Sequence, residues 1–312
     1  MRRAVATVAA LLLLGGCGGT DAPAADPTED TAPSGDASAG PRDKQRAEAE
    51  DLAEEAERLS NEGGSGTIGR RDEPVLGADI SWPQCPEGMG IPEKRTLGMP
   101  MPVPEAEFVV VGLTNGPGFT PNPCLAEQVE WVEERDLMIA AYAVASYPDG
   151  PTLEEYGGDG PFDAGTEKGR LRNAGYQQAR YNIGSMTDAG LRSPVVWIDV
   201  EPVPDFEWSG DKAANAAVVE GAARAYTDAG YDIGVYSTPY LWDEVVGDLS
   251  LGVPEWRAAG ETSSEEALAR CGKDWSIQGG EAVLGQWVQD SRDHNVTCPG
   301  VAADLGRWFH QY

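Results

Sequence analysis

The chain has 312 residues and a formal net charge of −29 at pH 7. Of its charged side chains, 38 acidic and 15 basic ones lie in residues 73–312. Nucleic acids are dense polyanions, so a chain this acidic is not expected to bind them. The only two histidines are His294 and His310, which argues against a Ser-His-Asp hydrolase.

The N-terminus has the pattern of an export signal. Arg2 and Arg3 precede an apolar run, residues 4–14, which is too short to span a bilayer as a mature helix. The run ends in Leu-Gly-Gly-Cys17, the pattern of a bacterial lipobox. We expect residues 1–16 to be removed and Cys17 to carry a lipid that anchors the protein to the outer face of the cell membrane. The alternative is an ordinary signal peptide followed by an unrelated cysteine.

Residues 17–72 differ in composition from the rest of the chain. Residues 18–42 are rich in Ala, Pro, Asp, Gly, Ser and Thr, a composition that cannot bury a core. Residues 43–60 have the composition of a short helix. This segment is predicted to be a flexible and partly helical tether between Cys17 and a domain at 73–312.

Within 73–312, apolar runs alternate with stretches of helical composition. In chain order, strands are predicted at 75–81, 108–113, 138–145, 195–200, 232–237, 255–259 and 282–288. Helices are predicted at 123–135, 166–189, 212–229, 240–246 and 264–270. Apolar strands joined by helices indicate a mainly parallel sheet covered by helices. The prediction is an α/β fold, a (β/α) barrel of the TIM type in a single globular domain, with a doubly wound sheet as the alternative.

Four cysteines remain once Cys17 is set aside, namely Cys85, Cys124, Cys271 and Cys298. An even number in an exported chain favours two disulfides. Pairing Cys85 with Cys124 and Cys271 with Cys298 joins neighbouring elements, although three pairings are possible. A zinc site is the competing interpretation, and no Cys-x-x-Cys spacing supports it.

The strand at 195–200 leads into two carboxylates, Asp199 and Glu201. Side chains alternate along a strand, so both point to one face, roughly 6–7 Å apart. Two acids on one face push each other's pKa values apart, which leaves one as an acid and the other as an anion. Cleavage of a sugar acetal uses such a pair. The alternative is a strand that runs into a solvated acidic loop.

Catalytic groups of a barrel lie at the carboxyl ends of its strands. Polar or aromatic residues stand at these positions of the other predicted strands: Asp79, Thr114, Asn115, Tyr142, Tyr236, Ser237, Gln286 and Trp287. Trp82 and Trp208 flank polar loop residues and are candidates for stacking on sugar rings. Trp197 lies inside a strand and is expected to be core.

On these motifs the domain resembles the family 25 glycoside hydrolases, lysozymes that cleave between N-acetylmuramic acid and N-acetylglucosamine. The family's opening Gly-x-Asp-x-Ser-x-x-Gln is similar to residues 77–84, and its central Asp-x-Glu to Asp199-Val-Glu201. Later similarities are Gly234-Val-Tyr236 through Trp242, Gly285-Gln286-Trp287 for Trp-Gln-Tyr, and residues 303–308 for the terminal Val-Asp-Leu-Asn-Arg-Phe. The resemblance covers nearly all of 76–309.

The resemblance implies a role for each candidate. Glu201 would be the general acid and Asp199 its electrostatic partner, with Asp79 and Asp304 at the floor of the same acidic site. By the resemblance, Tyr142 and Tyr236 would orient the sugar or hydrogen-bond to a carboxylate. Together with the strand-end and aromatic candidates, the predicted substrate contacts are Tyr142, Tyr236, Trp82, Trp208, Gln286 and Trp287. This chemistry needs no cofactor or metal, and the implied partner is the glycan of peptidoglycan.

The sequence also departs from the family's pattern. Ala143 stands where the family has a histidine, residues 147–167 form an insertion, and Asp205 and Glu207 lie in a loop beside the acidic pair. Two interpretations stay open. The first is a lipid-anchored glycosidase that acts on peptidoglycan, and the second is a catalytically silent module of the same fold that binds cell-wall glycan or an envelope protein.

Overall fold

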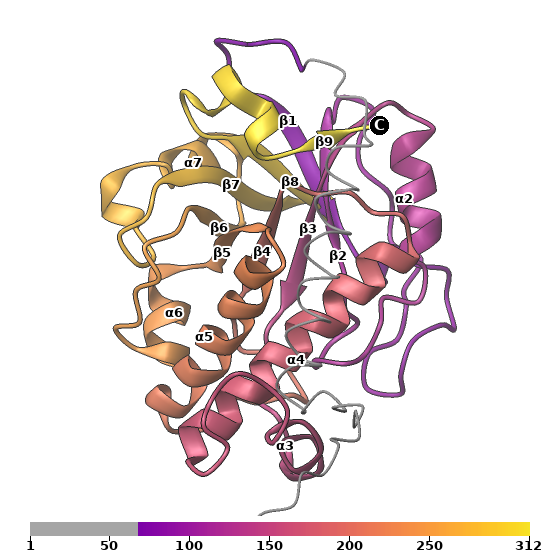
Figure 1. Cartoon of the computed structure of the whole chain (residues 1–312). Coiled ribbons are helices and arrows are strands. Elements are labelled where there is room, and N and C mark those ends of the chain that lie inside the picture. Colours follow the sequence, from indigo (N-terminus) through magenta and orange to yellow (C-terminus); the bar gives the residue numbers. More distant parts are fainter. Residues whose placement is uncertain (1–67) are drawn as a thin grey trace, which may run out of the picture. The chain divides into compact units, whose positions relative to one another are not determined.

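The computed structural model describes residues 68–312, coloured in Figure 1. The predicted signal peptide, Cys17 and nearly all of the tether lie outside the described residues. Within the described part, no helix is both long and apolar enough to cross a membrane.

Eight strands of the described chain close into a barrel. They are β1 (Leu76–Ile80), β2 (Phe108–Gly112), β3 (Met138–Val144), β4 (Val195–Asp199), β5 (Asp232–Ser237), β6 (Glu255–Glu261), β7 (Ala282–Gln289) and β8 (Arg292–Thr297). Neighbours in sequence pair with one another, and β8 returns to pair with β1. All pairings are parallel except those of β8, which runs antiparallel to β7 and β1. A short β9 (His310–Gln311) adds to β3. The barrel prediction is therefore confirmed.

Helices cover the outside of the barrel (Figure 1). They are α2 (Leu125–Glu133), α3 (Gly150–Tyr156), α4 (Glu167–Asp188), α5 (Lys212–Asp228), α6 (Pro239–Val246) and α7 (Ser264–Ala269). Side-chain caps explain where several of them begin. The Thr166 hydroxyl accepts from the Gly169 amide, and the Asp211 carboxylate accepts from the amides of Ala213 and Ala214. The five predicted helices are confirmed to within two residues, and α3 was not predicted.

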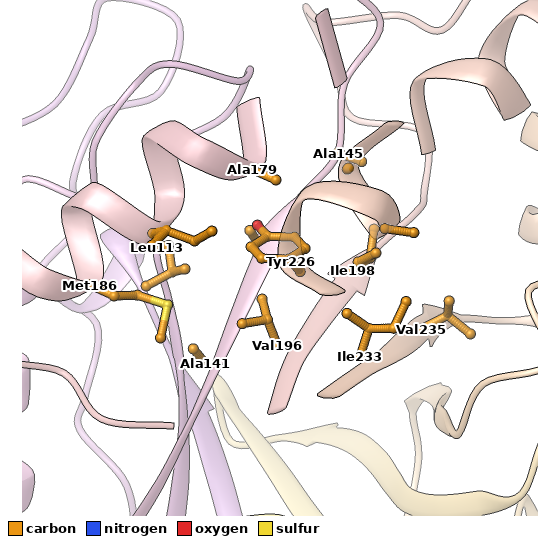
Figure 2. Packing of buried hydrophobic residues seen from close by; sticks show 14 of the residues in the cluster. Leu113, Ala141, Ala145, Ala179, Met186, Val196, Ile198, Tyr226, Ile233 and Val235 are labelled. Carbon is orange, nitrogen blue, oxygen red and sulfur yellow. The ribbon is translucent and has the colours of Figure 1, made fainter. Parts of the chain in front are cut away.

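The strands are apolar on both faces because each face contacts a different part of the core. On the outer face of β4, Val196 and Ile198 lie under Met186 of α4 and Tyr226 of α5 (Figure 2). On the inner face, Trp197 is fully buried, as predicted, within 6.1 Å (ring centroids) of both Trp256 and Trp308. This aromatic layer fills the barrel interior beneath the carboxyl ends of the strands.

Both predicted disulfides are present, Cys85–Cys124 and Cys271–Cys298. The first joins the segment after β1 to the start of α2, and the second joins the end of α7 to the end of β8. Each bridge thus pins a loop to the wall of the barrel.

The insertion at 147–167 packs against α4. Asn173 of α4 donates to the Gly157 carbonyl, and Gln177 donates to the Asp159 carbonyl. Tyr156 stacks on Phe119, with ring centroids 4.1 Å apart. These contacts hold the insertion on the outside of the barrel, alongside the helix that follows it.

Candidate active site

Strand alternation carries Asp199 into the barrel. It lies on the same face of β4 as Val195 and Trp197, which belong to the interior cluster. The neighbouring Val200 belongs to the outer cluster beneath the helices. Glu201 follows two residues after Asp199, so the pair faces the carboxyl end of the barrel as the sequence predicted.

The backbone around this pair is held on three sides. The Ala145 amide donates to the Asp199 carbonyl at 2.9 Å, and the Ser237 hydroxyl donates to the Val200 carbonyl at 2.6 Å. The indole Nε1 of Trp208 donates to the Glu201 carbonyl at 2.9 Å. Trp208 was predicted to contact sugar, but its ring packs partly buried against the outer core, so it anchors the loop after β4 instead.

A hydrogen-bonded network surrounds Asp79 at the end of β1. Its Oδ1 accepts from Asn295 Nδ2 at 2.6 Å and from Gln286 Nε2 at 3.1 Å. Tyr236 donates its hydroxyl proton to Gln286 Oε1 at 2.7 Å, and Trp256 donates to Asn295 Oδ1 at 2.7 Å. The two aromatic donors therefore orient both amides so that their N–H groups face Asp79.

The acids at this end of the barrel raise one another's pKa. Burial raises the pKa of Asp199 well above its usual range, and the charges of Glu201 and Asp79 add to this effect. Burial also raises the pKa of Glu201, whereas the Lys94 ammonium lowers it. Burial, followed by the charge of Asp293, raises the pKa of Asp79, against the lowering by its two amide donors. Protons are therefore held here at pH values where ordinary carboxylates are ionised.

Asp199 has an unsatisfied oxygen. Its side chain is 3% exposed, and Oδ1 has no hydrogen-bond partner. A buried acceptor without a partner is costly unless water or a ligand supplies a donor. Asp199 is thus prepared to accept a hydrogen bond from a bound molecule.

Tyr142 and Tyr236 lie on the inner face of the barrel among these acids. The charges of Asp79 and Asp199 add to the burial that raises the pKa of Tyr142, so this phenol stays protonated as a donor. Trp82 is half-buried in the loop after β1, with the Lys94 Nζ 5.2 Å from its ring centroid.

Two predicted site residues lie elsewhere. Trp287 follows Gln286 on β7, so it points outward, where it packs with Ala267 and Val296 and stacks on His294. Asp304 is exposed in a 3₁₀ segment (Val301–Arg307) that packs at the amino end of the barrel. Placing Trp287 and Asp304 in the site was wrong.

The structure brings in Asp293 instead, a residue that the sequence analysis missed. Asp293 lies on β8 directly opposite Asp79 of β1, and Asn295 is two residues further along the same inner face. Burial raises the pKa of Asp293 to about 6. Asp293-His-Asn295 repeats the Asp-x-Asn spacing of Val-Asp-Leu-Asn, a signal that the match at 303–308 obscured.

The acids of this site lie at the carboxyl ends of the strands, away from a cavity that the described chain contains. In residues 68–312, no group of three or more His, Cys, Asp and Glu side chains is arranged to hold a metal ion. A cavity of about 250 Å³ lies at the amino end of the strands, next to Arg71, Glu107 and Gln311, and contains none of the acids described above.

Together, fold and site define a (β/α)-barrel domain with a carboxylate-rich centre at the carboxyl ends of its strands.

Comparison with known proteins points to lysozyme-like domains. The family model of lysozyme-like protein 1 matches residues 166–268, which include Asp199, Glu201 and Tyr236. Counting factor 45-1 of Dictyostelium discoideum is 39% identical over 77 residues, 24% of this chain and 25% of that protein. Probable GH family 25 lysozyme 4 of the same organism is 36% identical over 92 residues, 29% of this chain and 40% of that protein. The chain thus matches less than half the length of these relatives.

Solved structures give a weaker likeness. A muramidase from Acremonium alcalophilum is 15% identical, with a TM-score of 0.47 over 75% of this chain and 99% of that one. A family GH25 lysozyme from Aspergillus fumigatus is 16% identical, with a TM-score of 0.41 over 72% of this chain and 94% of that one.

Proposed function

We propose that this protein is a glycoside hydrolase that cleaves the glycan strands of peptidoglycan. The observation that carries the proposal is the Asp199–Glu201 pair, two buried acids with raised pKa values at the carboxyl end of β4, with Asp199 Oδ1 unsatisfied. Cleavage of a glycosidic bond needs a protonated acid beside a second carboxylate. The matches to lysozyme-like proteins support the same reaction and substrate.

In this mechanism Glu201 is the general acid. Its raised pKa keeps the proton available until the leaving glycosidic oxygen takes it as the glycosidic bond breaks. Water then attacks the anomeric carbon and gives a proton to Glu201, which restores the acid. Asp199 stabilises the positive charge that develops at the anomeric carbon or on the acetamido group of the substrate. The Lys94 ammonium lowers the pKa of Asp199, and the positive charge that develops on the substrate lowers it further, so Asp199 acts as a carboxylate in the transition state. It therefore stabilises the transition state more than the ground state.

Tyr236, Gln286 and Asn295 keep Asp79 in place beside the pair. Their fixed hydrogen bonds limit reorganisation of the site when substrate binds. Tyr142 and Trp82 contact the sugar. The proposal includes export and a lipid anchor at Cys17, so that the domain would act next to the outer face of the membrane.

The test measures release of reducing ends from peptidoglycan. The full chain, purified in detergent, is compared with Glu201→Gln, which preserves size but cannot supply the proton. Loss of a general acid is expected to lower the rate by about 10²–10⁴-fold. Glu207→Gln, an exposed residue of the same loop, is the matched control and should retain activity.

The competing function is a binding module without catalysis. Wild-type protein that pulls down peptidoglycan but releases no reducing ends would establish that function instead. Equal activity of wild type and Glu201→Gln would leave a hydrolase in which Glu201 is not the acid.

A further inference from the structure

A lysine stands among the acids of the site. Lys94 belongs to the loop of residues 85–99, which follows the 3₁₀ turn Trp82–Gln84. Burial lowers the pKa of its ammonium, and the carboxylates of Glu201, Asp205 and Asp199 oppose that lowering. The same ammonium lowers the pKa of both Asp199 and Glu201. Its charge therefore acts directly on the proposed catalytic pair.

The loop that carries Lys94 is fixed at several points. The disulfide Cys85–Cys124 ties down its base. The side chain of Thr96 is buried and accepts from the Met89 amide at 2.8 Å. The Lys94 carbonyl accepts from Asn115 Nδ2, beyond the end of β2, at 3.3 Å. These contacts hold the backbone of Lys94 against the barrel.

The lysine stem is fixed as well. A β-carbon on Gly116 would lie 3.1 Å from both Lys94 Cγ and a ring carbon of Phe206, so both side chains pack over this glycine. The ammonium lies 5.2 Å from the centroid of the Trp82 ring, within the range of a cation–π interaction. Lys94 and Trp82 are thus one unit at the edge of the site.

Among residues 68–312, Lys94 forms no ion pair within 4.0 Å. Within residues 68–312, the charge pairs closer than 4.0 Å are formed by other cations, such as Lys212 with Asp243 and Arg257 with Glu255. The ammonium therefore acts on the site acids from a distance, and its N–H donors are free to contact a ligand.

The surroundings make a cation at this point significant. Residues 73–312 carry 38 acidic and 15 basic side chains, and the site itself is lined with carboxylates. A sugar with a negative substituent would be repelled unless a fixed positive charge met that substituent. Beside Lys94, the Trp82 ring offers a face on which a sugar ring can stack.

We propose that Lys94 and Trp82 form a recognition site for a carboxylate-bearing sugar unit, so that the enzyme prefers acidic glycans to neutral ones. This inference rests on the proposed glycosidase function and names Lys94 as a determinant of its specificity. In peptidoglycan such a carboxylate comes either from the lactyl group of a peptide-free muramic acid or from the attached peptide.

The experiment compares charged and neutralised forms of the same glycan. Peptide-free strands with free lactyl carboxylates are divided, and one half is converted to methylamides. Reducing-end release gives KM on each half for the full chain in detergent. The KM on amidated strands should exceed that on carboxylate strands by about tenfold to a hundredfold, the range of one hydrogen bond to a charged group.

Lys94→Met keeps the stem and removes the charge, so the ratio of the two KM values should fall close to one. Lys94→Arg should recover part of the ratio, and Lys168→Met, an exposed lysine on α4, should leave it at the wild-type value. Thermal unfolding of each variant checks that the fold is intact. A second arm uses peptide-bearing strands before and after amidation, and a ratio above one only in that arm identifies the peptide as the source of the carboxylate.

A ratio near one for wild type in both arms, or an unchanged ratio in Lys94→Met, would overturn the inference. If wild type cleaves neither form, the same ratio is taken from dissociation constants measured by titration calorimetry. A charge preference in binding that Lys94→Met removes would then support the recognition site although the hydrolase proposal had failed. Equal binding of both forms would reject the recognition site.

Discussion

At the scale of single residues, the site depends on how buried acids share protons. Asp79 has two amide donors, Asp199 has an oxygen with no partner, and Glu201 is influenced by a lysine. Three chemically similar carboxyl groups thus lie in three different environments at the same end of the barrel. Such differences are what separate an acid from an anion within a cluster.

Asp293 provides a test of this proton sharing through stability. Its native pKa is about 6, above the ordinary value of 3.8. Between these values the native state binds more protons than the unfolded state, so the free energy of unfolding falls as pH rises from about 4 to 6. We expect Asp293→Asn to match wild type at pH 4.5 and to exceed it at pH 7.5 by roughly 1–3 kcal/mol.

Urea unfolding at the two pH values measures this difference. Asp304→Asn, at an exposed position, serves as the control and should follow wild type at both. A variant Asp293→Asn that is no more stable than wild type at pH 7.5 would contradict the burial of this charge.

At the scale of elements, β6 carries a buried ion pair that organises its surroundings. Arg257 Nη2 lies 2.7 Å from Glu255 Oε2, and the side chains are 3% and 0% exposed. Glu255 also accepts from three backbone amides of residues 277–280, and Arg257 donates to the carbonyls of Arg270 and Gly272. The pair thus ties the segment between α7 and β7 to the barrel.

Arg257→Met would leave the Glu255 carboxylate buried without its cation. We expect the free energy of unfolding to fall by roughly 3–5 kcal/mol, measured by urea titration. Adding Glu255→Gln, which removes the unpaired charge, should recover part of that loss. The exposed pair of Arg224 and Asp228 gives the control, because Arg224→Met should cost about 1 kcal/mol or less.

Most of the predicted strands contain an apolar run. Val195–Asp199 and Phe108–Gly112 are buried at every position, so they could be found without knowing their partners. Strand β8 was missed because its sequence, Arg-Asp-His-Asn-Val-Thr, has no such run. Its inward side chains, Asp293 and Asn295, serve the site rather than the core.

Trp287 and Asp304 were wrongly placed in the site, each for a different physical reason. Gln286 and Trp287 are adjacent on β7, and alternation allows only one of them to face the interior. Asp304 was matched to a motif by order along the chain, although the acid that meets Asp79 comes from the strand paired with β1. The pairing of β8 with β1 arises when the barrel closes, and local sequence does not encode it. The strand that leads into Asp199 and Glu201 was predicted correctly because its apolar run is recognisable from sequence alone.

At the scale of the whole domain, two disulfides reinforce a single closed barrel. Cys85–Cys124 closes a segment with a sequence separation of 39, a length for which removal of a disulfide typically costs about 2–4 kcal/mol. The double variant Cys85→Ser, Cys124→Ser should therefore unfold at a lower temperature than wild type. Reductant should lower the midpoint of wild type further than that of the variant, which keeps only Cys271–Cys298. Equal midpoints for wild type and variant without reductant would contradict this role.

The network around Asp79 also has a consequence for the order of folding. Its hydrogen-bond partners Gln286 and Asn295 lie 207 and 216 residues further along the chain. Local helices can form while the polypeptide is still being synthesised. Contacts between residues this far apart in sequence form late, because the entropy lost in closing a long loop must first be offset by other contacts. The acidic centre therefore matures only when β7 and β8 are available. A chain that stops short of β8 can contain both Asp199 and Glu201 and still lack the finished site.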